Sequence, residues 1–403
     1  MSRRLEIGAL LALCFFLPLY EAPKSIFLAL YLVIWVVNRA RARDWGGPWD
    51  LWDSVFLSLF GSAVLVAIFA GLPGGQEWRG IVDLVRWGCA LWAVKRARYE
   101  VREVRWILGA LVFSGTVGIV QAYVALLNGQ GGGLQLNSVG HVNHTAIYIA
   151  IVFGVCVAWV LACWPRWSLP ARVAALALTM AMLGVLINTA SRGAVGMGVV
   201  LPLILALGWW RRWRAALPGT ALVVAAVVAA CFLFRAEVVV KQEALAEARN
   251  IPSNRIAIWR AAVHGWQRFP VAGVGIDNFK GITLERLREW RARAGEPFDA
   301  GAYAFFRHGH SLYFNTLAER GLIGSLPLAA LLLALLVSLI RERPGAAESD
   351  ETWLVWGSAA GAWIITCGVG LVNTTLHHEH GILAALLWGL WLSQRQARAV
   401  DRG

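Results

Sequence analysis

The stretch HTAIYIAIVFGVCVAWVLACW, residues 144–164, carries no acidic or basic residue apart from the histidine at its first position. A helix of this length can cross the hydrocarbon core of a bilayer, which is ~30 Å thick. Similar apolar runs, separated by short polar breaks, recur along the 403 residues, of which 58% are hydrophobic and only 15% charged. Soluble proteins carry about 25% charged residues. The pattern therefore predicts an all-α polytopic membrane protein and excludes a single water-soluble core.

We expect about twelve transmembrane helices and one large loop. The N-terminus lacks a small-residue cleavage site and is predicted to form an uncleaved first span. The predicted spans cover about residues 5–20, 25–38, 52–71, 80–94, 106–127, 144–164, 171–189, 193–210, 217–235, 311–340, 353–373 and 380–394. The chain then divides into spans one to nine (1–235), a loop with amphipathic helices (236–310), and spans ten to twelve with a tail (311–403).

The distribution of Lys and Arg predicts the orientation, because cytoplasmic loops are enriched in these residues. With the N-terminus inside, the inner side holds twenty of them: Arg3, Arg4, Arg39, Arg41, Arg43, Lys95, Arg96, Arg98, Arg102, Arg105, Arg166, Arg172, Arg211, Arg212, Arg214, Arg341, Arg343, Arg395, Arg398 and Arg402. The short outer loops hold little beyond Lys24, Arg79 and Arg192. Both termini are therefore predicted to be cytoplasmic.

This orientation places every histidine on the outer side or at its edge: His141, His144, His264, His308, His310, His377, His378 and His380. The large loop is also outside, and it carries twelve Lys and Arg residues when Arg235 and Arg307 are included. Long loops cross the membrane regardless of their charge, so the loop does not contradict the orientation.

Two helices are predicted within the loop. The segment SNRIAIWRAAVHGWQRFP (253–270) has Ser253 as a candidate N-cap and an apolar face predicted to contain Ile256, Trp259, Val263 and Trp266. The segment FKGITLERLREWRARAG (279–295) is predicted to form a second amphipathic helix with four arginines. Amphipathic helices of this kind lie along an interface, and docking of the arginines on anionic head groups is the simplest use for this one.

Four residues from separate segments could meet at the outer boundary of the membrane: Arg192, Arg255, His308 and His310. Arginine holds phosphate through a planar fork and keeps its charge, whereas histidine can take up a proton near neutral pH. We expect a lipid-linked diphosphate as the substrate, with its chain between the spans. Arginines can stabilise a departing diphosphate without a metal ion. A metal site is not expected, and Glu379 beside His377, His378 and His380 is the one cluster that could form one.

Several other polar residues have both a structural and a functional interpretation. Asp83 and Arg86 lie three residues apart in the fourth span, where they neutralise each other or Arg86 supports the diphosphate. Glu319 and Arg320 are expected to pair helices. His141 and His144 line the site or cap the sixth span. The glycines of VAGVGIDNF lack the strand–turn–helix setting of a nucleotide site and are read as a turn.

The six cysteines, at positions 14, 89, 156, 163, 231 and 367, are expected to be small core residues, since they show no disulfide or metal spacing.

Three motifs resemble the O-antigen ligase/polymerase superfamily: SRGA (191–194), SNRIAIW…PVAGVGIDNF (253–279) and HSLYFNTLAERGLIG (310–324). The family shows an Arg-Gly pair after a span, then Arg-x-x-x-Trp leading to Pro-x-x-Gly-x-Gly-x-x-x-Phe. A histidine then begins a segment that ends in Glu-x-Gly-Leu-Ile-Gly. The sequence departs from the family pattern at Ser311, where asparagine is expected.

The resemblance implies a membrane glycosyltransferase of the bacterial inner membrane, with its active site facing the periplasm and no ATP, metal or other cofactor. Such enzymes take a glycan from undecaprenyl diphosphate. A ligase passes it to the lipid A–core of lipopolysaccharide with inversion, a polymerase to another lipid-linked unit, and an oligosaccharyltransferase to protein. We expect a ligase, because the basic outer surface suits a phosphorylated acceptor and no large soluble tail follows the last span. No nucleic-acid partner is expected.

By motif position, Arg192 and Arg255 would hold the diphosphate, and His310 would be the general base on the acceptor hydroxyl. His308 would orient His310 or contact phosphate, or would be a capping or surface residue. A transporter for anionic lipids is the alternative from another class. It would require polar residues near mid-membrane or internal repeats, whereas here the polar residues collect at one face.

Overall fold

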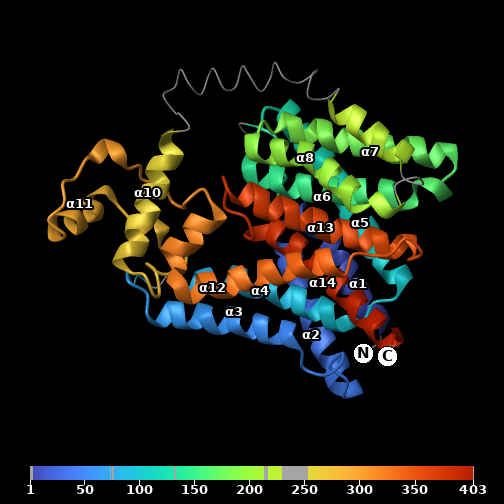
Figure 1. Ribbon diagram of the computed structural model, residues 1–403, viewed down its shortest axis with the longest axis horizontal. Helices are drawn as coiled ribbons and strands as arrows, with labels where there is room; N and C mark the ends of the chain where they lie inside the picture. The colour runs from blue at the N-terminus through green and yellow to red at the C-terminus, as the bar shows by residue number, and fades with distance from the viewer. Residues whose placement is uncertain are drawn as a thin grey trace.

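The computed structural model describes residues 3–72, 74, 77–130, 133–212, 217–228 and 253–402. Within these ranges the chain is all-α, without a strand (Figure 1). The α-helices are α1 (Arg3–Phe16), α2 (Glu21–Ala42), α3 (Leu51–Ile68), α4 (Glu77–Ala97), α5 (Val101–Leu127), α6 (Val142–Cys163), α7 (Leu169–Asn188), α8 (Arg192–Gly208), a helix over Leu217–Val228, α10 (Ser253–Arg268), α11 (Leu284–Arg293), α12 (Leu312–Arg341), α13 (Asp350–Gly370) and α14 (His378–Arg402).

Seven of these elements are long and apolar enough to cross a membrane: α2, α3, α5, α6 with the following turn, α7, α12 and α13. The α8 helix and Leu217–Val228 are apolar but shorter. The prediction of a polytopic all-α membrane protein is confirmed. The total of twelve spans stays a prediction, because α1, α4 and α14 do not meet the same criterion and residues 229–235 of the ninth span lie outside the described part of the chain.

The centre of the bundle is formed by α6 and α13, which pack against each other and are buried on almost every face. A methyl group added at Gly154 would lie 3.5 Å from the Cα of Gly361, so the two backbones approach closely through these glycines. Around this pair, α14 packs on α4, α12 packs on α3, and α1 packs on α2 and α5.

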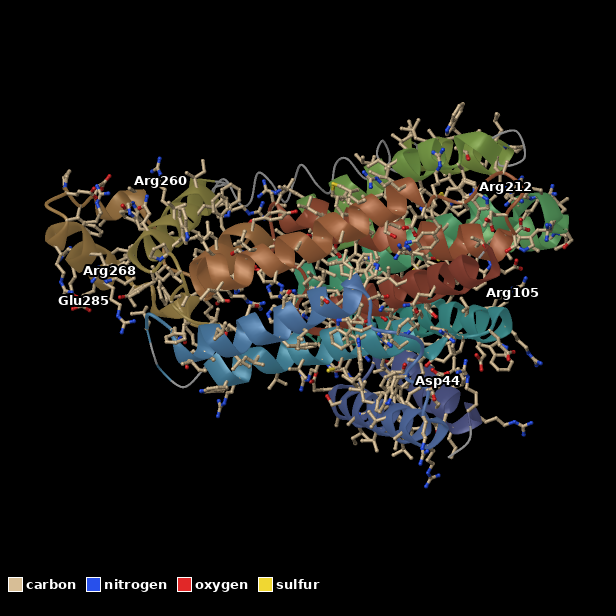
Figure 2. All side chains as sticks on the ribbon, turned by 60° about the horizontal axis from the view of Figure 1, so that its bottom comes forward. Asp44, Arg105, Arg212, Arg260, Arg268 and Glu285 are labelled. Carbon is tan, nitrogen blue, oxygen red and sulfur yellow. The ribbon has the colours of Figure 1, made fainter. Side chains whose placement is uncertain are left out.

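Both chain ends lie at one end of the bundle, and the loop helices α10 and α11 lie at the other (Figure 1). Figure 2 labels Arg105 and Arg212 at the first end and Arg260 and Arg268 at the second. Many of the basic residues counted for the inner side form ion pairs at the first end. Asp53 pairs with Lys95 and Arg96, Asp350 with Arg166 and Arg212, and Glu351 with Arg105. Which side of the membrane this end faces stays a prediction, and Arg214 lies outside the described residues.

The α12 helix is interrupted at Gly321, whose backbone angles are φ 54° and ψ −155°. The interruption leaves backbone N–H and C=O groups of α12 without partners inside the helix, and residues 270–275 of the loop form hydrogen bonds with them. The N–H groups of Leu322 and Ile323 donate to the carbonyls of Pro270 and Val271, both at 3.0 Å. In the other direction, the N–H groups of Val274 and Gly275 donate to the carbonyls of Ala318 and Glu319 at 2.8 and 2.9 Å. A methyl group at Gly321 would lie 2.4 Å from the Val271 carbonyl oxygen, so glycine is required there.

The glycine-rich turn also pairs with the end of α3. The N–H groups of Gly71 and Leu72 donate to the carbonyls of Gly273 and Val274 at 2.9 and 3.1 Å. Together with the bonds to α12, these contacts fix the turn between two spans. The glycines of VAGVGIDNF are therefore structural, in agreement with the turn expected from the sequence.

Both predicted loop helices are present, but the buried face of α10 differs from the prediction. The buried residues are Ile258, Ala261 and Ala262, whereas Ile256 is 52% exposed. Small residues let α10 pack closely on α12, and the larger Trp259 stays at the rim, stacked on Phe314 at 5.1 Å. This face joins a second hydrophobic core made of Ile258, Ala261, Ala262, Val274, Phe279, Ile282, Leu287 and Ala318. The loop is thus a folded unit on α12. The proposed capping role of the Ser253 side chain lies outside the described residues.

The five described cysteines have free thiols and are buried or half-buried, as expected, whereas Cys231 lies outside the described residues.

Candidate functional site

Seven of the eight histidines gather at the end of the bundle nearest the loop: His141, His144, His308, His310, His377, His378 and His380. The His308 and His310 rings lie 4.4 Å apart, and the His144 ring lies 5.2–5.6 Å from those of His141, His377, His378 and His380. His308 lies near enough to His141 and His377 for an electrostatic interaction with both, which joins the two groups. His264 is separate, on α10 against Tyr303.

The histidines meet because each segment precedes or begins a helix that starts at the same end of the bundle. His141 is the N-cap of α6, and its Nδ1 accepts a bond from the Asn143 N–H at 3.1 Å. His310 precedes the N-cap of α12, and His378 is the first residue of α14. Helix N-termini carry partial positive charge, so this end of the bundle favours anions.

His310 is held in a defined position between Gly309 and Ser311. Its φ of 45° is unusual for a residue with a side chain and costs roughly 1–3 kcal/mol. The Ser311 hydroxyl accepts from the Phe314 N–H at 3.5 Å and donates to the Gly370 carbonyl at 3.1 Å, which ties the start of α12 to the end of α13. Ser311, which replaces the asparagine of the family pattern, thus performs a capping role that asparagine also performs.

Glu319 supports this turn through Asn315. Its Oε2 accepts from the Asn315 side-chain Nδ2 at 2.9 Å, and the Asn315 side-chain Oδ1 accepts from the Gly309 N–H at 2.8 Å. The Glu319 Oε1 accepts from the Phe279 N–H at 3.2 Å. Glu319 therefore connects the histidine turn to the glycine-rich turn, which is more than the helix pairing expected from the sequence. The four-residue spacing of Asn315 and Glu319 on one helix was the signal for this contact.

Burial lowers the pKa of His310 to about 4, and the neighbouring His308, Arg255 and His141 contribute. Burial also lowers the pKa of His308, to which His377 and His141 add. Both imidazoles are neutral at neutral pH and can accept a proton from a bound hydroxyl group.

Arg192 and Arg255 lie close to each other although they come from separate helices. Arg192 is the exposed first residue of α8, after Ala190 with a φ of 50° and the N-cap Ser191. Arg255 is half-buried near the start of α10, where burial and then the charge of Arg192 lower its pKa. Among the residues that the structure describes, neither arginine forms an ion pair with a carboxylate. The structure thus places Arg255 near both Arg192 and His310, and His308 beside His310, while their role as one site stays a prediction.

Arg86 lies on another side of the histidine cluster. Its Nη1 is 3.5 Å from the Asp83 Oδ1, and the Asp83 Oδ2 lies 2.8 Å from the His377 Nδ1. Its mutual neutralisation with Asp83 is therefore present, and its role toward a diphosphate stays a prediction.

Glu379 belongs to the one cluster that could have formed a metal site, although no metal site was expected. Glu379 is buried and pairs with Lys24 of α2, and its Oε1 accepts from the Ser138 hydroxyl at 3.3 Å. This arrangement compensates two charges that would otherwise be buried alone. The acid that meets the imidazoles is Asp83, from a segment that sequence analysis did not connect with the histidines.

A family model described as O-Antigen ligase matches residues 177–329. The matched stretch includes Arg192, Arg255, His308 and His310, and it ends within α12. The resemblance to the O-antigen ligase superfamily is thereby confirmed for this part of the chain. No curated protein matches the chain significantly.

Proposed function

We propose that this chain, with its O-antigen ligase region over residues 177–329, is an O-antigen ligase of the bacterial inner membrane. It transfers a glycan from undecaprenyl diphosphate to the lipid A–core on the periplasmic side. The observation that supports this most directly is the convergence of Arg192, Arg255 and His310 from three helix starts at one end of the bundle.

The two arginines bind the donor diphosphate. Both are cations without a carboxylate partner among the described residues, and the N-termini of α8 and α12 add partial positive charge. As the bond between the sugar and the diphosphate breaks, negative charge grows on the leaving phosphate oxygen. Fixed guanidinium groups stabilise that charge, so the transfer step requires neither ATP nor a metal ion.

His310 is the general base. Its neutral imidazole takes the proton of the acceptor hydroxyl while the acceptor oxygen forms a bond to the anomeric carbon and the diphosphate departs. This single displacement inverts the anomeric configuration. A bound diphosphate would raise the pKa of His310 above the value of about 4 in the free protein, because a nearby anion favours the protonated imidazole. Proton transfer therefore becomes more favourable once the donor is in place.

The lipid chain of the donor has an apolar groove available below the site. A cavity of about 500 Å³ lies between α3 and α12 and is lined by Ser58, Gly61, Ser62, Leu65, Leu322, Ile323, Leu326 and Pro327. The groove lies past the interruption at Gly321, along the apolar part of α12 that packs on α3.

The charge of the loop favours the ligase over the polymerase and the oligosaccharyltransferase. The exposed side chains Arg260, Arg268, Arg286, Arg288 and Arg293 surround the folded loop unit (Figure 2 labels the first two). A lipid A–core carries several phosphates that such a surface attracts, whereas a peptide acceptor gains less from it and the acceptor of a polymerase carries only its own diphosphate. Polymerisation of lipid-linked units is the second candidate.

Purified protein in liposomes tests the proposal. Supplied with an undecaprenyl-diphosphate glycan and lipid A–core, it should produce glycan-bearing lipid A–core without ATP. Longer lipid-linked glycan made in place of that product would assign it as a polymerase. Movement of the donor lipid across the bilayer with no transfer to any acceptor would rule out the enzyme and favour the transporter.

A further inference from the structure

Asp83 of α4 and the adjacent His377 and His378 converge at the edge of the histidine cluster. One ligand atom from each lies within 4.8 Å of the others. The His377 Nδ1 is 2.8 Å from the Asp83 Oδ2, and the His378 Nδ1 is 3.6 Å from the same oxygen. Two imidazoles and a carboxylate are ligands of Zn²⁺ and of related divalent ions.

We propose that Asp83, His377 and His378 bind one divalent transition-metal ion of the zinc type. The site lies outside residues 177–329, so it does not follow from the family match. It is also independent of the proposed glycosyl transfer, which uses Arg192, Arg255 and His310.

Arg86 orients the carboxylate without occupying its metal-binding oxygen. The Arg86 Nη1 approaches the Oδ1 of Asp83 at 3.5 Å, whereas both imidazoles approach the Oδ2. A ligating carboxylate commonly has its second oxygen held by a neighbouring donor. The other nearby cation, Lys24, already pairs with Glu21 and Glu379 and is neutralised.

The backbone around the two histidines is constrained. Leu376 and His378 both have left-handed backbone angles, with φ of 57° and 46°. Such angles at residues with side chains concentrate at functional sites. They place the His377 and His378 rings in a stack with centroids 3.6 Å apart, which brings the Nδ1 atoms of both rings to the same Asp83 oxygen.

The site is open to solvent on one side. The side chains of Asp83, His377 and His378 are 27%, 35% and 43% exposed, so an ion can enter without unfolding of the bundle. Three protein ligands leave a fourth position of a tetrahedral ion for water or a phosphate oxygen. His144, whose ring lies 5.5 and 5.6 Å from the two histidine rings, is the nearest further imidazole around this position.

Metal binding is measured directly on the full chain, purified without a polyhistidine tag and stripped with EDTA. Zn²⁺ titrated against a chromophoric chelator should bind with one equivalent. Co²⁺ should give the strong visible absorption of a tetrahedral site. Asp83→Asn and His378→Gln should each weaken binding by about tenfold or more, whereas His264→Gln, outside the cluster, should not change it.

An unchanged affinity in both ligand variants, or no bound equivalent in the stripped parent protein, overturns the site. The use of two variants guards against misfolding of one of them, which gel filtration in detergent reports. Since the readout is metal content, loss of this site leaves the proposed transfer function standing, and absence of transfer activity leaves the site standing.

Discussion

The guanidinium group of Arg255 lies close enough to the His310 imidazole for its charge to lower the pKa of that ring, although the two residues come from different helices. A cation beside a general base keeps the base unprotonated in the free enzyme. In the proposed mechanism the same cation would bind the diphosphate, so donor binding and proton uptake would be coupled through one pair of residues.

The first prediction concerns Arg255→Ala. Removal of the cation should raise the pKa of His310 from about 4 toward its ordinary range, because one of the charges that lower it is lost. Activity requires the neutral imidazole, so the acidic limb of the pH profile of kcat/KM should move to higher pH. The KM for the donor should also rise. Arg260→Ala, an exposed arginine on the same helix, is the matched control and should leave the limb in place.

His310→Ala should reduce the transfer rate by roughly 10²–10⁴-fold, the usual contribution of a general base. Binding of the lipid-linked donor should persist, because Arg192 and Arg255 remain. Single-turnover rates and donor binding in detergent separate the two effects. If the variant keeps near-normal turnover, the base is another residue, and His308→Ala is then the variant to examine.

Glu319→Ala should lower turnover more than it changes donor affinity. It leaves the Phe279 N–H and the Asn315 amide without their acceptor, at a cost of about 1–3 kcal/mol each. The turn that carries His310 then loses its support. Glu319→Gln keeps one accepting oxygen and should recover part of the activity. A loss confined to donor affinity, with kcat unchanged, would argue against a positioning role.

Gly321→Ala should destabilise the protein. The backbone angles at Gly321 belong to a region that is essentially restricted to glycine, and the added methyl group would collide with the Val271 carbonyl. We expect a loss of roughly 2 kcal/mol or more and a lower Tm. Gly184→Ala, in a helix with no atom within 4 Å of the new methyl group, should keep the parent Tm. Equal melting of both variants would contradict the structural role of Gly321.

Hydrophobic periodicity predicted the helices well, because a membrane helix satisfies its backbone locally and its apolar length is readable in one stretch. Periodicity was less informative where the packing between helices determines which residues are buried. On α10, residue size determined the buried face, and the small Ala261 and Ala262 replaced the larger residues expected. Contacts between segments that are far apart in the sequence could not be predicted from the sequence either. The sequence offered no sign that Asp83 meets His377 or that Lys24 meets Glu379, since both contacts depend on how α4, α2 and α14 pack.

Within the candidate site, the motifs indicated the positions of Arg192, Arg255 and His310 near the starts of three helices, and their roles stay predictions. Glu319 was recognised as part of a motif but not as a support, because its contact with the Phe279 N–H depends on how a distant segment packs on α12.

The interruption of α12 has a consequence for how two bulky lipids reach the same centre. Four backbone hydrogen bonds join residues 270–275 to the interrupted helix α12. Movement of this segment away from α12 would leave those N–H and C=O groups without partners, where little water is available to take the place of the lost bonds. We therefore expect that the loop does not open as a lid, and that donor and acceptor would reach the proposed site laterally from the lipid phase.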